Sequence, residues 1–156
     1  MNCKANLLII GQGVERTELE QLIASCGLNS YVKIVNFKEN PFPYMLKADA
    51  VLLASRWEGL PNVALEALAL GKQVVATVGC GGVLDIKNLV DDQSLVIAET
   101  DEAYVSTLDQ IACRTQSCRD SKKSSGRDNQ LADSKLPSNY NLDAVIAKYE
   151  AAIFGR

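Results

Sequence analysis

The hydrophobic and polar positions of this chain follow two different periods. Short apolar runs bounded by glycine or polar residues are typical of buried strands, whereas apolar residues three or four positions apart indicate helices. Runs of the first kind predict strands at residues 5–13, 31–37, 50–55, 72–78 and 94–98. Because these runs are apolar almost throughout, both faces of the predicted sheet are expected to be covered.

A helical pattern separates the predicted strands. In the first such segment Leu19, Leu22 and Ile23 have helical spacing, and Gly27 supplies a C-cap. Further helices are predicted at residues 40–49, 61–71, 79–90 and 101–114. Strands that alternate with helices in this way predict parallel βαβ units, and therefore an α/β, Rossmann-like parallel sheet with helices on both faces.

The size and composition of the chain suit one compact domain over residues 1–156, of which 47% are hydrophobic. Within this domain, residues 115–139 are polar and predict a loop or insert. Residues 142–154 then predict a last helix.

The charged residues exclude some classes of function. A formal net charge of -3 supplies no basic field, so a nucleic acid is not expected as a partner, although a small anion can still be bound locally. The absence of histidine from the sequence excludes His-based triads and imidazole bases in this chain. Acid or base chemistry here must therefore use carboxylates or the backbone.

The five cysteines include no C-x-x-C pair, and the chain opens with a polar stretch rather than a signal peptide. Both features predict reduced thiols and a cytoplasmic location. No apolar run approaches the roughly 18 residues that a membrane span needs. Peripheral association with the inner face of a membrane stays compatible with this sequence.

Residues 55–71, SRWEGLPNVALEALALG, combine a turn, a helix start and two glutamates. They follow a predicted parallel strand, and open parallel sheets bind ligands beyond the carboxyl ends of their strands. Pro61 suits the first turn of a helix, where no amide donor is needed. The next three amides are then left pointing at solvent or ligand, an arrangement suited to phosphate. They belong to Asn62, Val63 and Ala64.

Two carboxylates flank this helix start. Glu58 precedes the turn, and Glu66 lies one turn into the helix, from which its side chain can reach back toward the N-terminus. A carboxylate beside a phosphate is repelled unless it has another role, such as accepting hydrogen bonds from a ribose diol at about 1.5–3 kcal/mol per charged bond. The alternative is that Glu58 is a solvated loop residue and Glu66 an exposed helix residue.

The longer stretch SRWEGLPNVALEALALGKQVVAT resembles the donor-site motif of the retaining glycosyltransferases of family 4, also called group 1. The shared features are Glu58 and Glu66 with seven residues between them, a helix of small residues, a glycine and a VVAT strand. The flanking stretches LLIIGQG, YVKIVNFKENPFPYMLKADAVLLAS and CGGVLDI match the order of that family's C-terminal, nucleotide-sugar-binding half. The resemblance covers about residues 7–111 and implies the C-terminal half of a GT-B fold.

The resemblance implies roles for the matching residues. Glu66 would accept from the ribose hydroxyls, and Glu58, the candidate catalytic residue, would face the donor sugar and position it rather than attack it. The other donor-binding residues that it implies are Gly59, Leu60, Pro61, Asn62, Val63, Gly11, Gly13, Asn36 and Phe37. The first five would lie at the sugar and diphosphate, the glycine turn beside the acceptor and phosphate, and the last two near the base.

The same resemblance implies the reaction. A hexosyl group would pass with retention from a nucleotide-diphosphate sugar to a glycan or lipid-linked acceptor, in polysaccharide biosynthesis by family analogy. No cofactor and no bound metal are expected. Positive groups and helix amides would stabilise the diphosphate leaving group as its charge develops.

Five further residues have competing interpretations. GQGVER departs from the dinucleotide fingerprint because Arg16 occupies the third glycine position, so a nicotinamide cofactor is not expected. Arg16 either approaches a phosphate or is solvated. Gly81 and Gly82 either supply amides to a ligand or form a tight turn. Trp57 is expected to be a packing residue rather than a stacking platform. Asp85 stands where the family usually has Glu, which leaves its role open.

The family's enzymes have two Rossmann-like halves, and this chain contains no match to the acceptor-binding half. The strand that opens the C-terminal half, and the Arg and Lys after it, should lie upstream of LLIIGQG. In a 3-2-1-4-5-6 sheet that strand is central. Either the chain is a fragment of a longer gene, or its strands close up into a five-stranded sheet. Alone it is expected to be inactive without an N-terminal acceptor domain or partner chain.

Two other classes of function stay open. The first is a noncatalytic nucleotide-sugar-binding module that acts with a separate partner chain. The second is a protein similar to the sugar-nucleotide epimerases, which is disfavoured because that group does not share EGLPNVALEAL.

Overall fold

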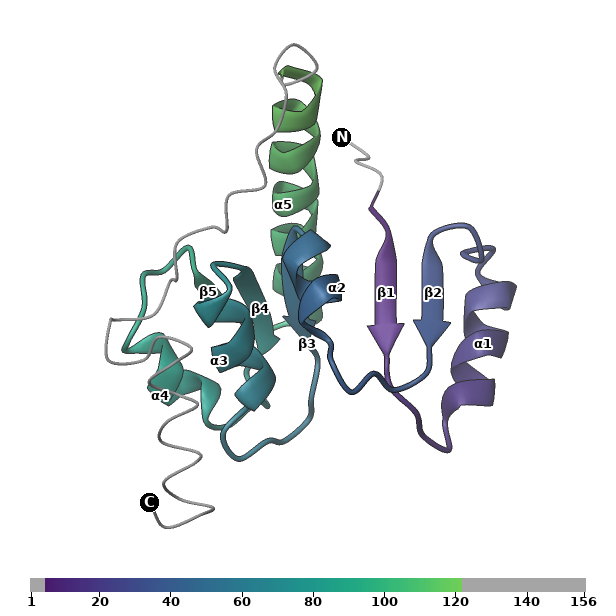
Figure 1. The fold of residues 1–156 in the computed structure, drawn as a ribbon, viewed down its shortest axis with the longest axis horizontal. Coiled ribbons are helices and arrows are strands. Elements are labelled where there is room, and N and C mark those ends of the chain that lie inside the picture. Colours follow the sequence, from purple (N-terminus) through teal and green to yellow (C-terminus); the bar gives the residue numbers. More distant parts are fainter. Residues whose placement is uncertain (1–4, 122–156) are drawn as a thin grey trace. The chain divides into compact units, whose positions relative to one another are not determined.

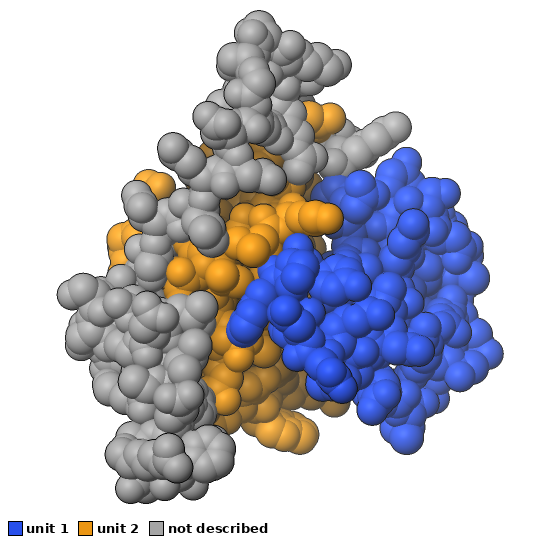
Figure 2. Space-filling model, in the orientation of Figure 1, with its two compact units in different colours: residues 1–44 blue, residues 45–156 orange. Residues whose placement is uncertain are grey.

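The computed structural model describes residues 5–121, with side chains for residues 5–117. Strands alternate with helices throughout this range (Figure 1). The chain divides into two compact units, Met1–Tyr44 and Met45–Arg156, which Figure 2 colours separately. Each unit is described here by itself. The predicted helix at 142–154 lies outside the described residues.

The first unit consists of one βαβ motif with parallel strands. β1 (Leu7–Ile10) and β2 (Val32–Val35) pair in parallel, with Leu7 opposite Val32 and Ile10 opposite Val35. The intervening helix is α1 (Arg16–Ser25). It ends where Gly27 adopts a positive φ of 68°, as predicted for a C-cap glycine.

The second unit contains a three-stranded parallel sheet in the order β3-β4-β5. Its elements are β3 (Ala50–Leu53), α3 (Asn62–Ala69), β4 (Gln73–Thr77), α4 (Val83–Lys87), β5 (Leu95–Ala98) and α5 (Asp101–Ser121). The short helix α2 (Phe42–Lys47) crosses the boundary between the units. Gly71, with a φ of 69°, ends α3.

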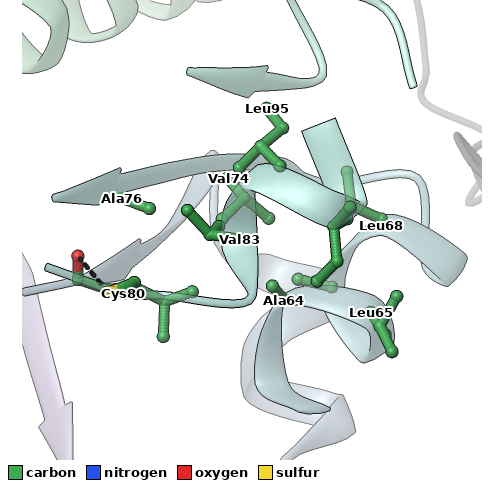
Figure 3. Close-up of a cluster of buried hydrophobic side chains, with 11 residues drawn as sticks. Ala64, Leu65, Leu68, Val74, Ala76, Cys80, Val83 and Leu95 are labelled. Carbon is green, nitrogen blue, oxygen red and sulfur yellow. Dashed lines mark hydrogen bonds between the residues drawn. The ribbon is translucent and has the colours of Figure 1, made fainter. Parts of the chain in front are cut away.

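The core of the second unit forms where α3 and α4 cover the sheet. Side chains of Leu68 from α3 and Val83 from α4 meet Val74 and Leu95 of the strands, and all four are fully buried (Figure 3). Burying a side chain of this size stabilises the fold by about 1.5–3 kcal/mol. The core therefore fixes the start of α3 relative to the end of β3, which is where the candidate glutamates lie.

The five strands, their parallel direction and the α/β class are as predicted. Within the first unit β1 pairs with β2, and within the second unit β3 and β5 both pair with β4. The gene fragment and the five-stranded sheet both stay predictions. The single domain over residues 1–156 stays a prediction.

The predicted loop at residues 115–139 is wrong over its first part, because α5 continues to Ser121. Polar composition favoured a loop, but residues 115–121 contain neither Gly nor Pro to end the helix. The Thr115 hydroxyl also bonds back to the carbonyl of Ile111 at 2.6 Å, which satisfies it within the helix. The rest of the segment lies outside the described residues.

The structure tests the predictions on the cysteines and on membrane-spanning segments. Cys26 and Cys80 are free thiols, as predicted, whereas Cys113 is disulfide-bonded, so the prediction of reduced thiols is wrong there. Among residues 5–121, every helix is too short or too polar to cross a bilayer.

Candidate functional site

The β3–α3 loop (residues 54–61) follows the carboxyl end of β3 and carries Glu58. The Glu58 side chain is exposed, and the Ser55 hydroxyl donates a hydrogen bond of 2.7 Å to its Oε1. A hydrogen bond to a charged acceptor is roughly twice as strong as one between neutral groups. The carboxylate at the rim of the sheet is therefore held by its own loop.

The β4–α4 loop (residues 78–82) packs directly on this first loop. The Gly82 amide donates to the Gly59 carbonyl at 2.8 Å, and a Cβ on Gly82 would lie only 2.2 Å from that oxygen. A Cβ on Gly79 would lie 2.5 Å from the Arg56 carbonyl. No side chain fits at these contacts, so glycine is what allows the two backbones to touch.

These contacts decide between the two interpretations of Gly81 and Gly82. The Gly81 amide donates to the Gly79 carbonyl at 3.0 Å, and the Gly82 amide is taken by Gly59. In this structure both amides are engaged within the protein. The tight-turn interpretation is therefore confirmed, and the interpretation as ligand-binding amides is not supported.

The start of α3 differs slightly from the prediction. Pro61 is buried and stands at the N-cap, one position before the helix, with extended backbone angles. The Ala64 amide donates to the Pro61 carbonyl at 2.9 Å, so of the three amides expected to face a ligand, that of Ala64 is taken. Asn62 and Val63 are exposed at the first turn. No acidic side chain of α3 lies in that turn to compete with an anion.

Glu66 lies on the second turn of α3, between the buried Leu65 and Ala67. Its side chain is half-buried, and this burial raises the pKa of the Glu66 carboxyl above its ordinary value. Burying a charged carboxylate makes folding less favourable unless a ligand or a neighbouring group stabilises the charge. Perturbed carboxyl groups at the mouth of a parallel sheet are typical of binding sites.

Sequence reasoning missed three residues that hold this loop in place, namely Ser55, Thr77 and Cys80. The Thr77 hydroxyl donates to the Ser55 carbonyl at 2.9 Å, and the Cys80 thiol lies 3.5 Å from the same oxygen. Cys80 is fully buried and also approaches the Leu53 carbonyl, as the dashed line in Figure 3 marks. Ser55 and Glu58 have the S-x-x-E spacing of a capping box, and this signal could have identified Ser55 from the sequence.

Tyr104 of α5 has a hydroxyl that is buried and has no hydrogen-bond partner among the described residues. Burial raises the pKa of the Tyr104 phenol, and the charge of Cys80 raises it further. The phenol therefore lies near Cys80.

The Trp57 side chain is 81% exposed, so its prediction as a packing residue is wrong. It lies in the β3–α3 loop, whose neighbouring Arg56 and Leu60 are exposed as well. The loop points its one large aromatic ring at solvent because the backbone contacts of Gly79 and Gly82, and not side-chain packing, hold it in place.

The remaining candidates belong to the first unit. Gly11 and Gly13 follow β1, and neither has a positive φ or an atom near enough to exclude a Cβ. Asn36 and Phe37 follow β2, and Phe37 is 62% exposed. The candidates thus fall into two groups, one in each unit, each at the carboxyl ends of its strands.

Arg16 is engaged within the protein rather than simply solvated, and its approach to a phosphate stays a prediction. Its guanidinium donates to the Asn36 Oδ1 at 2.8 Å, to the Ile34 carbonyl at 3.2 Å and to Glu20 at 2.8 Å. It therefore ties the start of α1 to the end of β2.

A family model agrees with this geometry. The model described as glycosyl transferases group 1 matches residues 1–125. Among curated relatives, the N-acetylgalactosamine-N,N'-diacetylbacillosaminyl-diphospho-undecaprenol 4-alpha-N-acetylgalactosaminyltransferase of Campylobacter jejuni is 36% identical over 95 residues, which cover 61% of this chain and 26% of that protein. An uncharacterized glycosyltransferase of Methanocaldococcus jannaschii is 36% identical over 73 residues, 47% of this chain and 18% of that protein.

Solved structures show the same fold. The lipopolysaccharide outer core galactosyltransferase WaaB superposes with a TM-score of 0.67 at 17% identity, over 96% of this chain and 40% of that chain. WaaG, a glycosyltransferase involved in lipopolysaccharide biosynthesis, gives a TM-score of 0.62 at 23% identity, over 71% and 30% of the two chains. The curated relatives are longer proteins, of which this chain spans between 18% and 31%. Both the sequence motif and the fold are shared, and the chain belongs to the group 1 glycosyltransferases.

Proposed function

We propose that this chain is the donor-binding domain of a retaining glycosyltransferase, which holds a nucleotide-diphosphate sugar while its hexosyl group passes to a glycan or lipid-linked acceptor. The observation that carries the proposal is the arrangement at the end of β3. There Glu58 is held by Ser55, α3 starts directly after it, and the half-buried Glu66 lies one turn further on.

The two glutamates have different tasks in this proposal. Glu66 accepts hydrogen bonds from the ribose hydroxyls, which stabilise its charged form and offset the unfavourable burial of that charge. Glu58 accepts from hydroxyls of the donor sugar and positions it. Gly59, Leu60 and Pro61 form the turn between these two groups, in which Glu58 and Leu60 are exposed.

The diphosphate lies at the start of α3 in this proposal. Helix N-termini favour anions because their first amides lack intrahelical acceptors and the helix dipole adds partial positive charge. The first-turn residues Asn62 and Val63 are exposed there. The proposal includes no metal and no cofactor: helix amides and positive groups stabilise the leaving diphosphate.

The donor-binding candidates of the first unit are also part of the proposal. We assign the turn of Gly11 and Gly13 to the phosphate and acceptor side, and the backbone at Asn36 and Phe37 to the base. The bond from Arg16 to Asn36 supports this assignment because it orders the segment after β2. The exposed ring of Phe37 offers an apolar surface beside that segment.

Names of relatives suggest which ligands to test first. The Anabaena protein HepE, of the same fold with a TM-score of 0.59 at 21% identity, has been solved in complex with UDP and glucose. The Campylobacter relative is named for a diphospho-undecaprenol acceptor. UDP-sugars and lipid-linked acceptors are therefore the first candidates here.

The acceptor side comes from outside this chain in our proposal. This chain spans only 26% of the Campylobacter relative, and another protein of this fold is described as part of a GtfA/B complex. An N-terminal acceptor domain or a partner chain would complete the transferase. A cytoplasmic location, with peripheral association at the inner face of the membrane, fits such acceptors.

Calorimetric titration of residues 1–156 with UDP, GDP, ADP and UDP-glucose tests the proposal. One nucleotide is expected to bind, and its sugar conjugate to bind more tightly because Glu58 adds contacts to the sugar. Glu58→Ala should remove that gain, whereas Glu18→Ala, which removes an exposed carboxylate from α1, should not. A folded chain that binds none of the four ligands would contradict the proposal.

A further inference from the structure

In the proposed function Ser55 contacts no ligand, but its hydroxyl makes the contact that holds Glu58. We propose that Ser55 is a positioning residue for the Glu58 carboxylate, and that Thr77 in turn fixes Ser55. The inference rests on the proposed function, because it concerns how the sugar-facing glutamate is kept in its binding geometry.

The first step is the contact itself. Ser55 Oγ lies 2.7 Å from Glu58 Oε1, three residues further along the same loop. Glu58 is exposed, and an exposed glutamate loses rotamer freedom when it binds a ligand. The bond restricts that freedom before the ligand arrives. It engages one carboxylate oxygen, and Oε2 can accept from a sugar hydroxyl.

The second step is how Ser55 is fixed. Its carbonyl accepts a hydrogen bond from the Thr77 hydroxyl at 2.9 Å, while the buried Cys80 thiol lies 3.5 Å away. Leu53 pairs with Ala76, so Thr77 is the next residue of β4 and lies beside the chain as it leaves β3. The half-buried Ser55 is thus anchored to the central strand of its sheet.

The third step separates positioning from general support of the fold. In the proposed function Glu58 contacts the sugar and Glu66 contacts the ribose. Loss of the Ser55 hydroxyl should therefore weaken binding of the nucleotide sugar and leave binding of the bare nucleotide unchanged. A residue that only stabilised the loop or the fold would affect both ligands alike.

The test is calorimetric titration of residues 1–156 and its variants with UDP and with UDP-glucose. Ser55→Ala is expected to weaken UDP-glucose about three- to tenfold and to change UDP by less than about twofold. Ser55→Thr, which keeps the hydroxyl, should restore the affinity. Thr77→Val should act in the same direction as Ser55→Ala, and Thr77→Ser should not. Ser25→Ala removes an exposed hydroxyl of α1 as a matched control.

Four results would overturn the inference. Equal losses for both ligands in Ser55→Ala would show a structural role, and no loss for either would show that the bond does not position Glu58. Wild type that binds neither ligand would contradict the proposed function itself, and the positioning role with it. Finally, urea unfolding midpoints of Ser55→Ala, Glu58→Gln and the double variant must be non-additive, since additive shifts would mean that the two side chains do not interact.

Discussion

Glu66 lowers the stability of the folded chain at neutral pH. Burial raises the pKa of its carboxyl, so the folded chain holds that proton more tightly than the unfolded chain does. The stability that this proton contributes is present below the ordinary pKa of Glu and is lost as the pH rises through the raised value. A neutral side chain at this position would avoid the loss.

Glu66→Gln is therefore expected to be more stable than wild type at neutral pH. The difference in the free energy of unfolding should be small near pH 4, grow as the pH rises through the folded-state pKa, and then level off. Urea denaturation across this pH range measures it. A difference that stays constant or shrinks with rising pH would contradict the raised pKa of Glu66.

Tyr104 has a buried hydroxyl with no hydrogen-bond partner among the described residues. An unsatisfied buried polar group costs about 1–3 kcal/mol. Tyr104→Phe removes the hydroxyl and keeps the ring, so the free energy of unfolding should rise by up to about 1 kcal/mol. A fall of more than about 1 kcal/mol in thermal or urea unfolding would mean that the hydroxyl does have a partner.

Single residues were predicted with mixed success. Glu58 and Glu66 became candidates because a glutamate in a turn and another on an apolar helix have no packing reason to be there, and their roles stay predictions. The support by Ser55, Thr77 and Cys80 was missed because it joins the ends of two different strands. Pairing of that kind depends on register, which the sequence pattern does not specify.

At the scale of elements, the two loops beyond β3 and β4 form one body. Their backbones touch at Gly79 and Gly82, and the Gly82 amide bonds to Gly59. The position of Glu58 therefore depends on glycines that lie more than twenty residues further along the chain.

Gly82→Ala should destabilise the second unit by about 1–3 kcal/mol, because its Cβ would lie 2.2 Å from a backbone oxygen that cannot move alone. The matched control is Gly59→Ala on the other side of the same contact, where an added Cβ meets no atom within 4 Å. Its effect should stay within about 0.5 kcal/mol. Equal effects in urea unfolding would contradict the steric explanation.

Helix and strand positions were predictable because the glycines that end helices and the spacing of apolar residues indicate the same boundaries. Gly27 and Gly71 adopt the positive φ that ends α1 and α3, and the strands are short, mostly apolar runs. The extension of α5 to Ser121 was missed because polar composition was taken as the signal, although nothing in that segment breaks a helix.

At the scale of the whole molecule, the described strands form a two-stranded parallel sheet in the first unit and a three-stranded one in the second. Sequence periodicity predicts that a strand exists and that it is buried, but not which strand lies beside it. The α/β class could therefore be predicted, and the division of the strands could not. The family assignment came from the spacing of the motif around Glu58 and Glu66, which is local in sequence.

Donor binding at the end of β3 is tested most directly through Trp57, the one tryptophan of the sequence, which is 81% exposed and adjacent to Glu58. We would titrate folded residues 1–156 with UDP-glucose and follow the tryptophan emission, with circular dichroism to verify the fold. A saturable change is expected, shifted to about 10- to 150-fold higher ligand concentration in Glu66→Ala and unshifted in Glu18→Ala. A folded chain whose emission does not respond, or responds equally in Glu66→Ala, would contradict a donor site here.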